Sequence, residues 1–152
     1  MDDYNKIKRF CAIQERSHAE IREKLYRYGL FKKDVEKILA ELIGEGYINE
    51  ERFAHHYAGG KFRMKKWGRV KIRYCLKKQG VSSANINDAI DEISEEDYLK
   101  ALNRLAEKKW LLLSKENLLV RKSKAIQYLL QKGYERPLAV KAVEKAATAE
   151  KA

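Results

Sequence analysis

The residues best suited to chemistry in this sequence form one basic stretch. Residues 61–80 read KFRMKKWGRVKIRYCLKKQG and contain nine lysines and arginines without one acidic residue. Clustered cations of this kind bind anions, either the phosphates of a nucleic acid or the carboxylates of an acidic protein surface. The stretch therefore indicates an anionic partner, and the elements that carry it decide which cations lie together.

Side chains that could perform catalysis are few. The three histidines include the adjacent His55 and His56, which would point about 100° apart on a helix and could not readily share a metal ion. Cys11 and Cys75 lie outside any CxxC pattern and are interpreted as small apolar core residues. No P-loop, HExxH, GxSxG or dinucleotide motif occurs. We therefore expect a protein that is not an enzyme and has no metal or cofactor.

The charge is distributed unevenly along the chain. The net charge is +11 over 152 residues, yet residues 2–52 are neutral, with eleven basic and eleven acidic side chains. The excess of positive charge therefore lies in the rest of the chain.

The N-terminal MDDYNKIKRF lacks the apolar core of a signal peptide, and no run of eighteen apolar residues occurs. We expect a soluble, cytoplasmic monomer that does not bind membranes.

An internal repeat predicts the elements that position these cations. One proline and an abundance of Leu, Lys, Glu, Ala and Arg favour helices throughout, hence an all-α fold. Segments 17–43, 68–93 and 121–146 superpose as pairs of amphipathic helices. In the superposition a leucine is followed four residues later by a glycine suited to end a helix: Leu25 with Gly29, Leu76 with Gly80, and Leu129 with Gly133.

A further helix precedes each pair. Its expected start is acidic or capped, at Asp2, Asn49 and Ser94. The sequence thus predicts three tandem three-helix repeats, at residues 1–48, 49–93 and 94–152. Because small repeats are stabilised by stacking, we expect an elongated, curved array, with a compact bundle of the same helices as the alternative.

The basic stretch contains the first helix of the middle pair, from about Gly68 to Lys78. Its buried side would comprise Ile72, Cys75 and Leu76, bordered by cations on both sides. These cations could cover apolar surface with their aliphatic stems, or they could contact a partner. The other repeats lack the full set, which favours a contact. The cations are Lys66, Arg69, Arg73 and Lys77 on one flank, if the helix begins early enough to include residue 66, and Lys71 and Lys78 on the other.

The neighbouring residues narrow the kind of contact. The next helix, ANINDAIDEI, carries Asp88, Asp91 and Glu92, which would face phosphates if it entered the major groove of DNA. Sequence-specific reading of a duplex by this helix is therefore disfavoured. Trp67 and Trp110 each lie beside a lysine pair, where a tryptophan could stack on an unpaired base or, more commonly, belong to the core.

Three segments carry a resemblance to a known family. They are RSHAEIREKL at 16–25 with the glycine at 29, GYINEERFAHHY at 46–57, and KKWGRVKIRYCLKKQGV at 65–81. With these segments the chain resembles the RecX regulatory proteins, bacterial modulators of the RecA recombinase, from about residue 7 to residue 146. The family usually has an aspartate before RFA, where this chain has Asn49, Glu50 and Glu51. The third repeat is the least similar, and WLLLSKENLLVRKSK is specific to this chain.

The resemblance implies three tandem three-helix repeats and regulation by binding. Proteins of this family bind within the helical groove of the RecA filament, oppose its growth, and inhibit its ATPase and strand exchange. We therefore expect a regulator of recombination and DNA repair whose cations meet acidic groups of the recombinase, phosphates of single-stranded or double-stranded DNA, or both. The candidate binding residues are Lys65, Lys66, Arg69, Lys71, Arg73, Lys77 and Lys78, followed by Lys108, Lys109, Arg121, Lys122 and Lys124.

Two other functions fit the same residues. A stand-alone helical repeat module could bind single-stranded DNA through its phosphates without any recombinase. A general protein-interaction scaffold would show no dependence on a recombinase at all.

Overall fold

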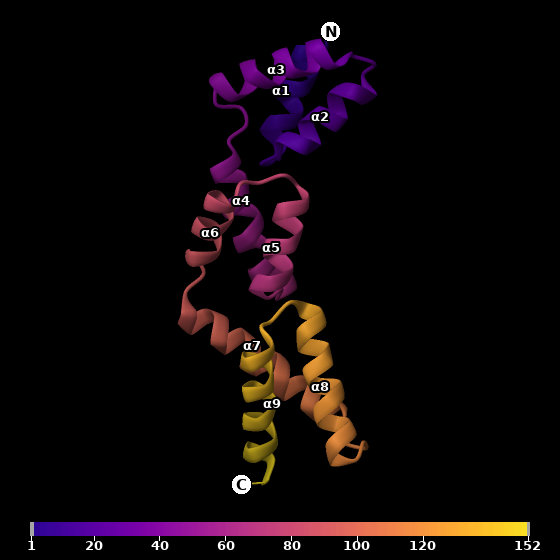
Figure 1. Ribbon diagram of the computed structural model, residues 1–152, viewed down its shortest axis with the longest axis vertical. Helices are drawn as coiled ribbons and strands as arrows, with labels where there is room; N and C mark the ends of the chain where they lie inside the picture. Colours follow the sequence, from indigo (N-terminus) through magenta and orange to yellow (C-terminus); the bar gives the residue numbers. More distant parts are fainter. Residues whose placement is uncertain (1, 152) are drawn as a thin grey trace. The chain divides into compact units, whose positions relative to one another are not determined.

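The computed structural model describes the backbone of residues 2–151 and the side chains of residues 2–150, and most of this range is helical (Figure 1). Over these residues there are nine α-helices and one π-helical segment, with no β-strand, so the predicted all-α fold is confirmed. Residues 1 and 152, the ends of the first and third predicted repeats, lie outside the described residues, and the repeat boundaries stay a prediction. The elements are α1 (Asp3–Ile13), α2 (His18–Arg27), α3 (Lys32–Gly44), α4 (Glu50–Gly60), η1 (Lys61–Lys65), α5 (Arg69–Lys78), α6 (Ser83–Asp91), α7 (Glu95–Leu112), α8 (Leu118–Lys132) and α9 (Arg136–Lys151).

The helix starts follow from local side-chain chemistry. Asp2 accepts a hydrogen bond from the Asn5 amide at 2.8 Å, and Ser94 accepts one from the Asp97 amide at 3.1 Å. Asn49 does the same for the amide three residues on, at 2.8 Å. Each cap supplies an acceptor for an amide that has no partner within the helix. The three predicted starts are confirmed.

The helix ends carry the glycines that the repeat predicted. Gly29, Gly80 and Gly133 have φ angles of +90°, +80° and +101°, in the left-handed region where a side chain would be strained. Leu25 and Leu129, four residues before two of them, are completely buried. The repeat therefore aligns residues with the same structural role: a buried leucine and a left-handed glycine that ends the helix.

The described residues form two compact units. The first comprises the chain up to Ala58 together with Cys75–Ala89, and the second comprises Gly59–Tyr74 together with the chain from Ile90 onward. In the first unit α1, α2 and α3 enclose an apolar core that includes Ile7, Ile21 and Val35. Residues of α4, α5 and α6, the helices of the predicted middle repeat, contribute to both units.

The two cysteines differ in their surroundings. Cys11 belongs to the core of the first unit, as expected. Cys75 is only half-buried, so its prediction as a core residue is corrected. It lies beside Tyr57, whose pKa is raised to about 12, first by burial and then by a hydrogen bond with Cys75.

The second unit is built on α7, α8 and α9, which lie side by side (Figure 1). Helix α7 buries Tyr98, Leu102, Ala106 and Trp110, which recur every four residues and therefore form one apolar stripe. Trp110 is only 2% exposed, which confirms the core alternative for this tryptophan. The segment Gly59–Tyr74 completes the unit and brings the basic stretch against α7.

Candidate anion-binding surface

The basic stretch begins in a distorted continuation of α4. The chain continues from Gly60 into the wider π-helical segment η1, and Lys66, the residue after η1, has a left-handed φ of +59°. A lysine in this conformation is strained by about 1 kcal/mol or more, so neighbouring groups must hold it. The Tyr134 hydroxyl donates to the Lys66 carbonyl at 2.8 Å, and Lys132 Nζ donates to the Lys65 carbonyl at 2.9 Å. The last residue of α8 and the turn before α9 thus fix the backbone of Lys65 and Lys66.

The start of α5 is fixed by a close backbone contact with the end of α8. The Gly68 amide donates to the Lys132 carbonyl at 2.8 Å, and the Val70 amide donates to the Gly133 carbonyl at 2.9 Å. A Cβ on Gly68 would lie 2.4 Å from the Gly133 carbonyl. These bonds pair amides at the start of one helix with carbonyls at the end of another. Helix α5 therefore begins at Arg69, and Lys66 does not lie on its flank.

Arg69 serves the packing of the second unit. Its guanidinium donates to Glu135 at 2.9 Å and to Glu95, and it covers the Tyr98 ring at 3.7 Å from the centroid. The side chain is only 20% exposed. A guanidinium already paired with two carboxylates has little capacity for a partner's anions. Arg69, a predicted binding residue, is therefore not expected to contact a partner.

Glu135 and Tyr98 share this network. The Tyr98 hydroxyl accepts a hydrogen bond from the Arg69 amide at 3.0 Å and donates to Glu135. Burial alone would raise the pKa of Glu135, but hydrogen bonds from Tyr98 and Arg69 outweigh it and lower the pKa. Burial and the bond to Glu135 raise the pKa of Tyr98 far above its ordinary value. The positive charge of Arg69 and the negative charge of Glu135 therefore balance each other within the second unit.

Trp67 is neither a fully buried core residue nor a freely exposed ring on which a base could stack. It is half-buried, and the ammonium groups of Lys61 and Lys71 lie 5.0 and 4.5 Å from its ring centroid. Cations over an indole ring are attracted by its negative face. Lys71, a candidate binding residue, is therefore engaged in a cation–π contact inside the second unit.

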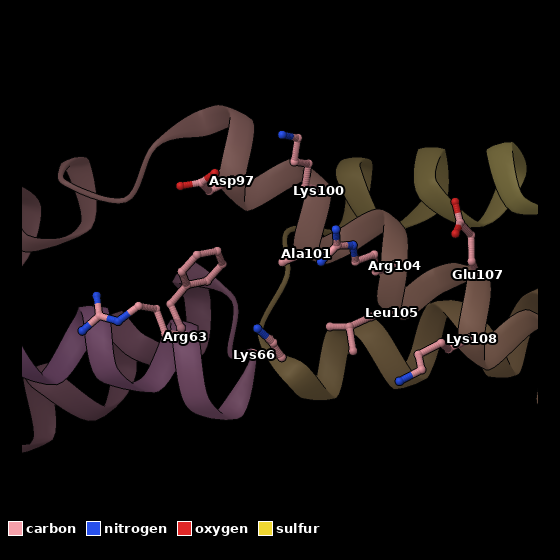
Figure 2. A pocket seen from close by; sticks show the side chains of 10 residues that line it. Arg63, Lys66, Asp97, Lys100, Ala101, Arg104, Leu105, Glu107 and Lys108 are labelled. Atoms are coloured by element: carbon pink, nitrogen blue, oxygen red, sulfur yellow. The ribbon is translucent and has the colours of Figure 1, made fainter.

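The second unit also contains a hollow of about 730 Å³ between η1 and α7, which we call the basic groove (Figure 2). Five cationic residues and two acidic residues line it, with apolar residues between them. Figure 2 shows Lys66, Leu105 and Lys108 gathered on one side of α7, with Lys100 and Glu107 on the other. The lining consists of Phe62, Arg63, Lys66, Asp97, Lys100, Ala101, Arg104, Leu105, Glu107 and Lys108.

The groove brings together two predicted residues and adds three others. Lys66 and Lys108 were candidates, whereas Arg63, Lys100 and Arg104 were missed. The signal for α7 was present in part, because residues 104 and 108 are one helical turn apart, but Lys100 and Lys108 lie on different sides of the helix (Figure 2). Arg63 carries no comparable signal, since its position depends on η1. The Arg63 guanidinium lies beside Gly59, and one of its nitrogens is 2.7 Å from the position that a Cβ on Gly59 would occupy.

The remaining candidates on α7 and α8 do not form one surface. Arg121 is buried, donates twice to the Trp110 carbonyl at 2.9 and 2.7 Å, and pairs with Glu150 at 2.9 Å. Its prediction as a binding residue is thus corrected: burial commits it to the core. Lys122 pairs with Glu144 at 3.3 Å.

The other two lysines of this group line a second, smaller hollow. Lys124 pairs with Glu116 at 2.6 Å, and Lys109 lies 4.8 Å from the centroid of the Tyr128 ring. This hollow has a volume of about 270 Å³. Lys108 and Lys109, adjacent in sequence, therefore line different hollows.

Three candidates on α5 are exposed. They are Arg73, Lys77 and Lys78, of which Arg73 and Lys77 are one helical turn apart. Arg73 belongs to the second unit, and the two lysines belong to the first. They remain candidates for contact with a partner.

Neither a metal site nor a membrane span is found in the described part of the chain. Among the described residues, no group of three or more histidines, cysteines and carboxylates is placed to hold a metal ion. None of the described helices is both long enough and apolar enough to span a bilayer.

Comparison with known proteins places these features in one family. Residues 49–90 match the family model described as "RecX, second three-helix domain", and residues 95–145 match "RecX, third three-helix domain". The chain is 35% identical to the regulatory protein RecX of Clostridium perfringens (strain 13 / Type A) over 123 residues, covering 79% of this chain and 57% of the relative. It is 29% identical to that of Clostridium tetani over 139 residues, covering 88% of this chain and 63% of the relative. The chain thus spans about three fifths of the length of these relatives.

Solved structures show the same fold. The crystal structure of RecX from Lactobacillus salivarius superposes with a TM-score of 0.84 at 22% identity, over 95% of this chain and 94% of that one. A crystal structure of a regulatory protein RecX superposes with a TM-score of 0.85 at 23% identity, over 93% of this chain and 70% of the other. At these identities the likeness supports the helical repeat fold.

Proposed function

The chain belongs to the RecX family, and from this premise we propose that it is a regulatory protein that binds the RecA filament within its helical groove. By this proposal it inhibits the recombinase and ATPase activities of the filament and so modulates recombination and DNA repair in the cytoplasm. The observation that carries the proposal is the family match, which extends over the second and third three-helix domains and includes the basic stretch.

The proposed mechanism uses cations on two elements. Exposed side chains of α5, and the basic groove between η1 and α7, would meet acidic groups of the recombinase or phosphates of the DNA inside the filament. A protein held across subunits blocks addition of the next subunit or hinders rearrangement. Inhibition of the ATPase then follows indirectly, from binding alone.

The test uses the full chain and a preformed RecA filament on single-stranded DNA. We expect the wild-type protein to inhibit strand exchange and ATP hydrolysis. The double variant Arg73→Glu/Lys77→Glu should inhibit at least about tenfold less well, because two reversed charges would remove favourable contacts and add repulsion. Circular dichroism checks that the variant keeps its helical content.

A matched control comes from α3 of the first unit. Lys33→Glu/Lys37→Glu changes the net charge equally on an exposed helix face outside the basic stretch. Inhibition should be nearly unchanged. If the wild-type protein leaves strand exchange untouched, the proposal is wrong; if both double variants lose inhibition equally, α5 is not the contact.

The affinity for free DNA distinguishes the regulator from the alternative function, a stand-alone module that binds single-stranded DNA. If phosphates dominate, the logarithm of that affinity should fall with the logarithm of salt concentration, with a slope of about 0.7 per contact. Weak binding to free DNA, combined with tight binding to the preformed filament, favours the regulator.

A further inference from the structure

From the lining of the basic groove we infer that it binds a short acidic segment of a partner protein that also carries an apolar side chain. This inference rests on the proposed function and specifies the chemistry of the partner at one site. The groove lies wholly within the second unit, and its volume of about 730 Å³ is in the range of pockets that accept a ligand.

The charges of the groove favour carboxylates at a regular spacing. Arg104 and Lys108 are one helical turn apart, which is about 6 Å along α7, whereas Lys100 lies on the other side of the helix and pairs with Glu96 at 3.1 Å (Figure 2). In an extended peptide, side chains on the same side are separated by two residues, or about 6.7 Å. Acidic residues at alternate positions could therefore meet successive cations of α7.

The floor of the groove favours an apolar side chain beside those carboxylates. Ala101 and Leu105 lie between the cations on the side of α7 that faces Lys66 (Figure 2). A purely ionic ligand would leave this apolar surface in contact with water. A segment with leucine or a similar residue among its acids would bury it.

The lining offers no free aromatic face to the bases of a nucleic acid. Phe62 is the aromatic residue of the lining, but it is 9% exposed and its ring stacks on Tyr98 at 5.9 Å. It therefore offers no free face on which a base could stack.

The inference is tested by fluorescence anisotropy with the full chain and the fluorescein-labelled peptide Glu-Ser-Glu-Ser-Leu, whose glutamates and leucine lie on the same side of an extended chain. Arg104→Glu/Lys108→Glu should weaken binding of this peptide by about tenfold or more, since both cations become repulsive. The control Lys141→Glu/Lys145→Glu makes the same change of net charge at the same spacing on exposed positions of α9. It should change the affinity less than about twofold.

Three further probes sharpen the result. Peptides with glutamine for glutamate, or with serine for leucine, should each bind more weakly than the original. Labelled oligothymidylate should bind more weakly than the peptide and should be less affected by the groove variant. The inference is overturned if the peptide does not bind, if the two double variants lose affinity equally, or if oligothymidylate binds more tightly and is lost in the groove variant.

The outcomes also separate this inference from the proposed function. A groove variant that fails to bind the peptide but still inhibits the RecA filament fully would show that the groove does not serve the regulator, while regulation stands. A wild-type protein that binds the peptide but leaves the filament active would contradict regulation, while the groove assignment stands.

Discussion

At Arg69 one guanidinium is shared by Glu95 and Glu135 and also covers the ring of Tyr98. The residue lies in the middle of a strongly basic stretch, yet its charge is already balanced by the fold. Arg121 resembles it, because an ion pair with Glu150 and two hydrogen bonds to the Trp110 carbonyl hold its buried guanidinium in place. For these two arginines, removal would leave carboxylates or carbonyls without partners, a cost of about 1–3 kcal/mol each.

Glu135 makes the stability of the second unit depend on pH. Its pKa is lowered below the ordinary value of 4.5, so the ionised form is favoured by folding. Its contribution to stability is present above the unfolded pKa and is lost as the pH falls through the folded pKa. We expect Glu135→Gln to be less stable than wild type at pH 7, with a difference that shrinks below about pH 4.5. Urea unfolding at pH 7 and pH 4 measures it.

Tyr98→Phe serves as a companion variant for this measurement. It keeps the ring under Arg69 but removes the hydroxyl that donates to Glu135. Its difference from wild type should shrink in the same direction on acidification. A difference that stays constant between pH 7 and pH 4 for both variants would contradict the assignment to Glu135.

At the scale of elements, the contact between the start of α5 and the end of α8 limits what the chain can tolerate. Gly68→Ala places a methyl group 2.4 Å from the Gly133 carbonyl, and neither backbone segment can yield without losing the hydrogen bonds that join them. We expect a loss of about 1–3 kcal/mol in unfolding free energy, in the range of overpacked sites. Thermal and urea denaturation followed by circular dichroism would measure it.

Gly60→Ala is the matched control for this substitution. Gly60 is helical, and a Cβ there would meet nothing within 4 Å. Alanine should stabilise the helix by about 0.5–1 kcal/mol, because glycine loses more backbone freedom on folding. Equal effects of the two substitutions would mean that the close contact is not decisive.

The elements were more predictable than the site. Helix starts at Asp2, Asn49 and Ser94, and the left-handed glycines after α2, α5 and α8, depend on neighbours within a few residues, so the sequence predicts them. The fate of Arg69 depends on Glu135, 66 residues away, and no local pattern contains that information. The positions of Arg63 and Lys66 were equally hard to predict, because the extra residue in the π-helical turn changes the direction of the side chains that follow it.

At the scale of the whole molecule, the repeat still predicts an elongated, curved array and a monomer. A compact domain of this length would have a radius of gyration of about 15 Å. We expect small-angle X-ray scattering of the full chain to give a clearly larger value, with a molecular mass of one chain. A value near that of a compact domain would support the single bundle instead, and twice the mass would contradict the monomer.

The segment Gly59–Tyr74 lies far from α8 and α9 in sequence but completes their unit. Phe62 and Arg69 both lie against the ring of Tyr98, and the Lys66 carbonyl accepts a hydrogen bond from the Tyr134 hydroxyl. A fragment that begins at Ser94 would therefore expose two tyrosines that are at most 1% exposed in the full chain. The boundaries of the predicted repeats and those of the compact units thus differ, so we expect such a fragment to be less stable than the full second unit.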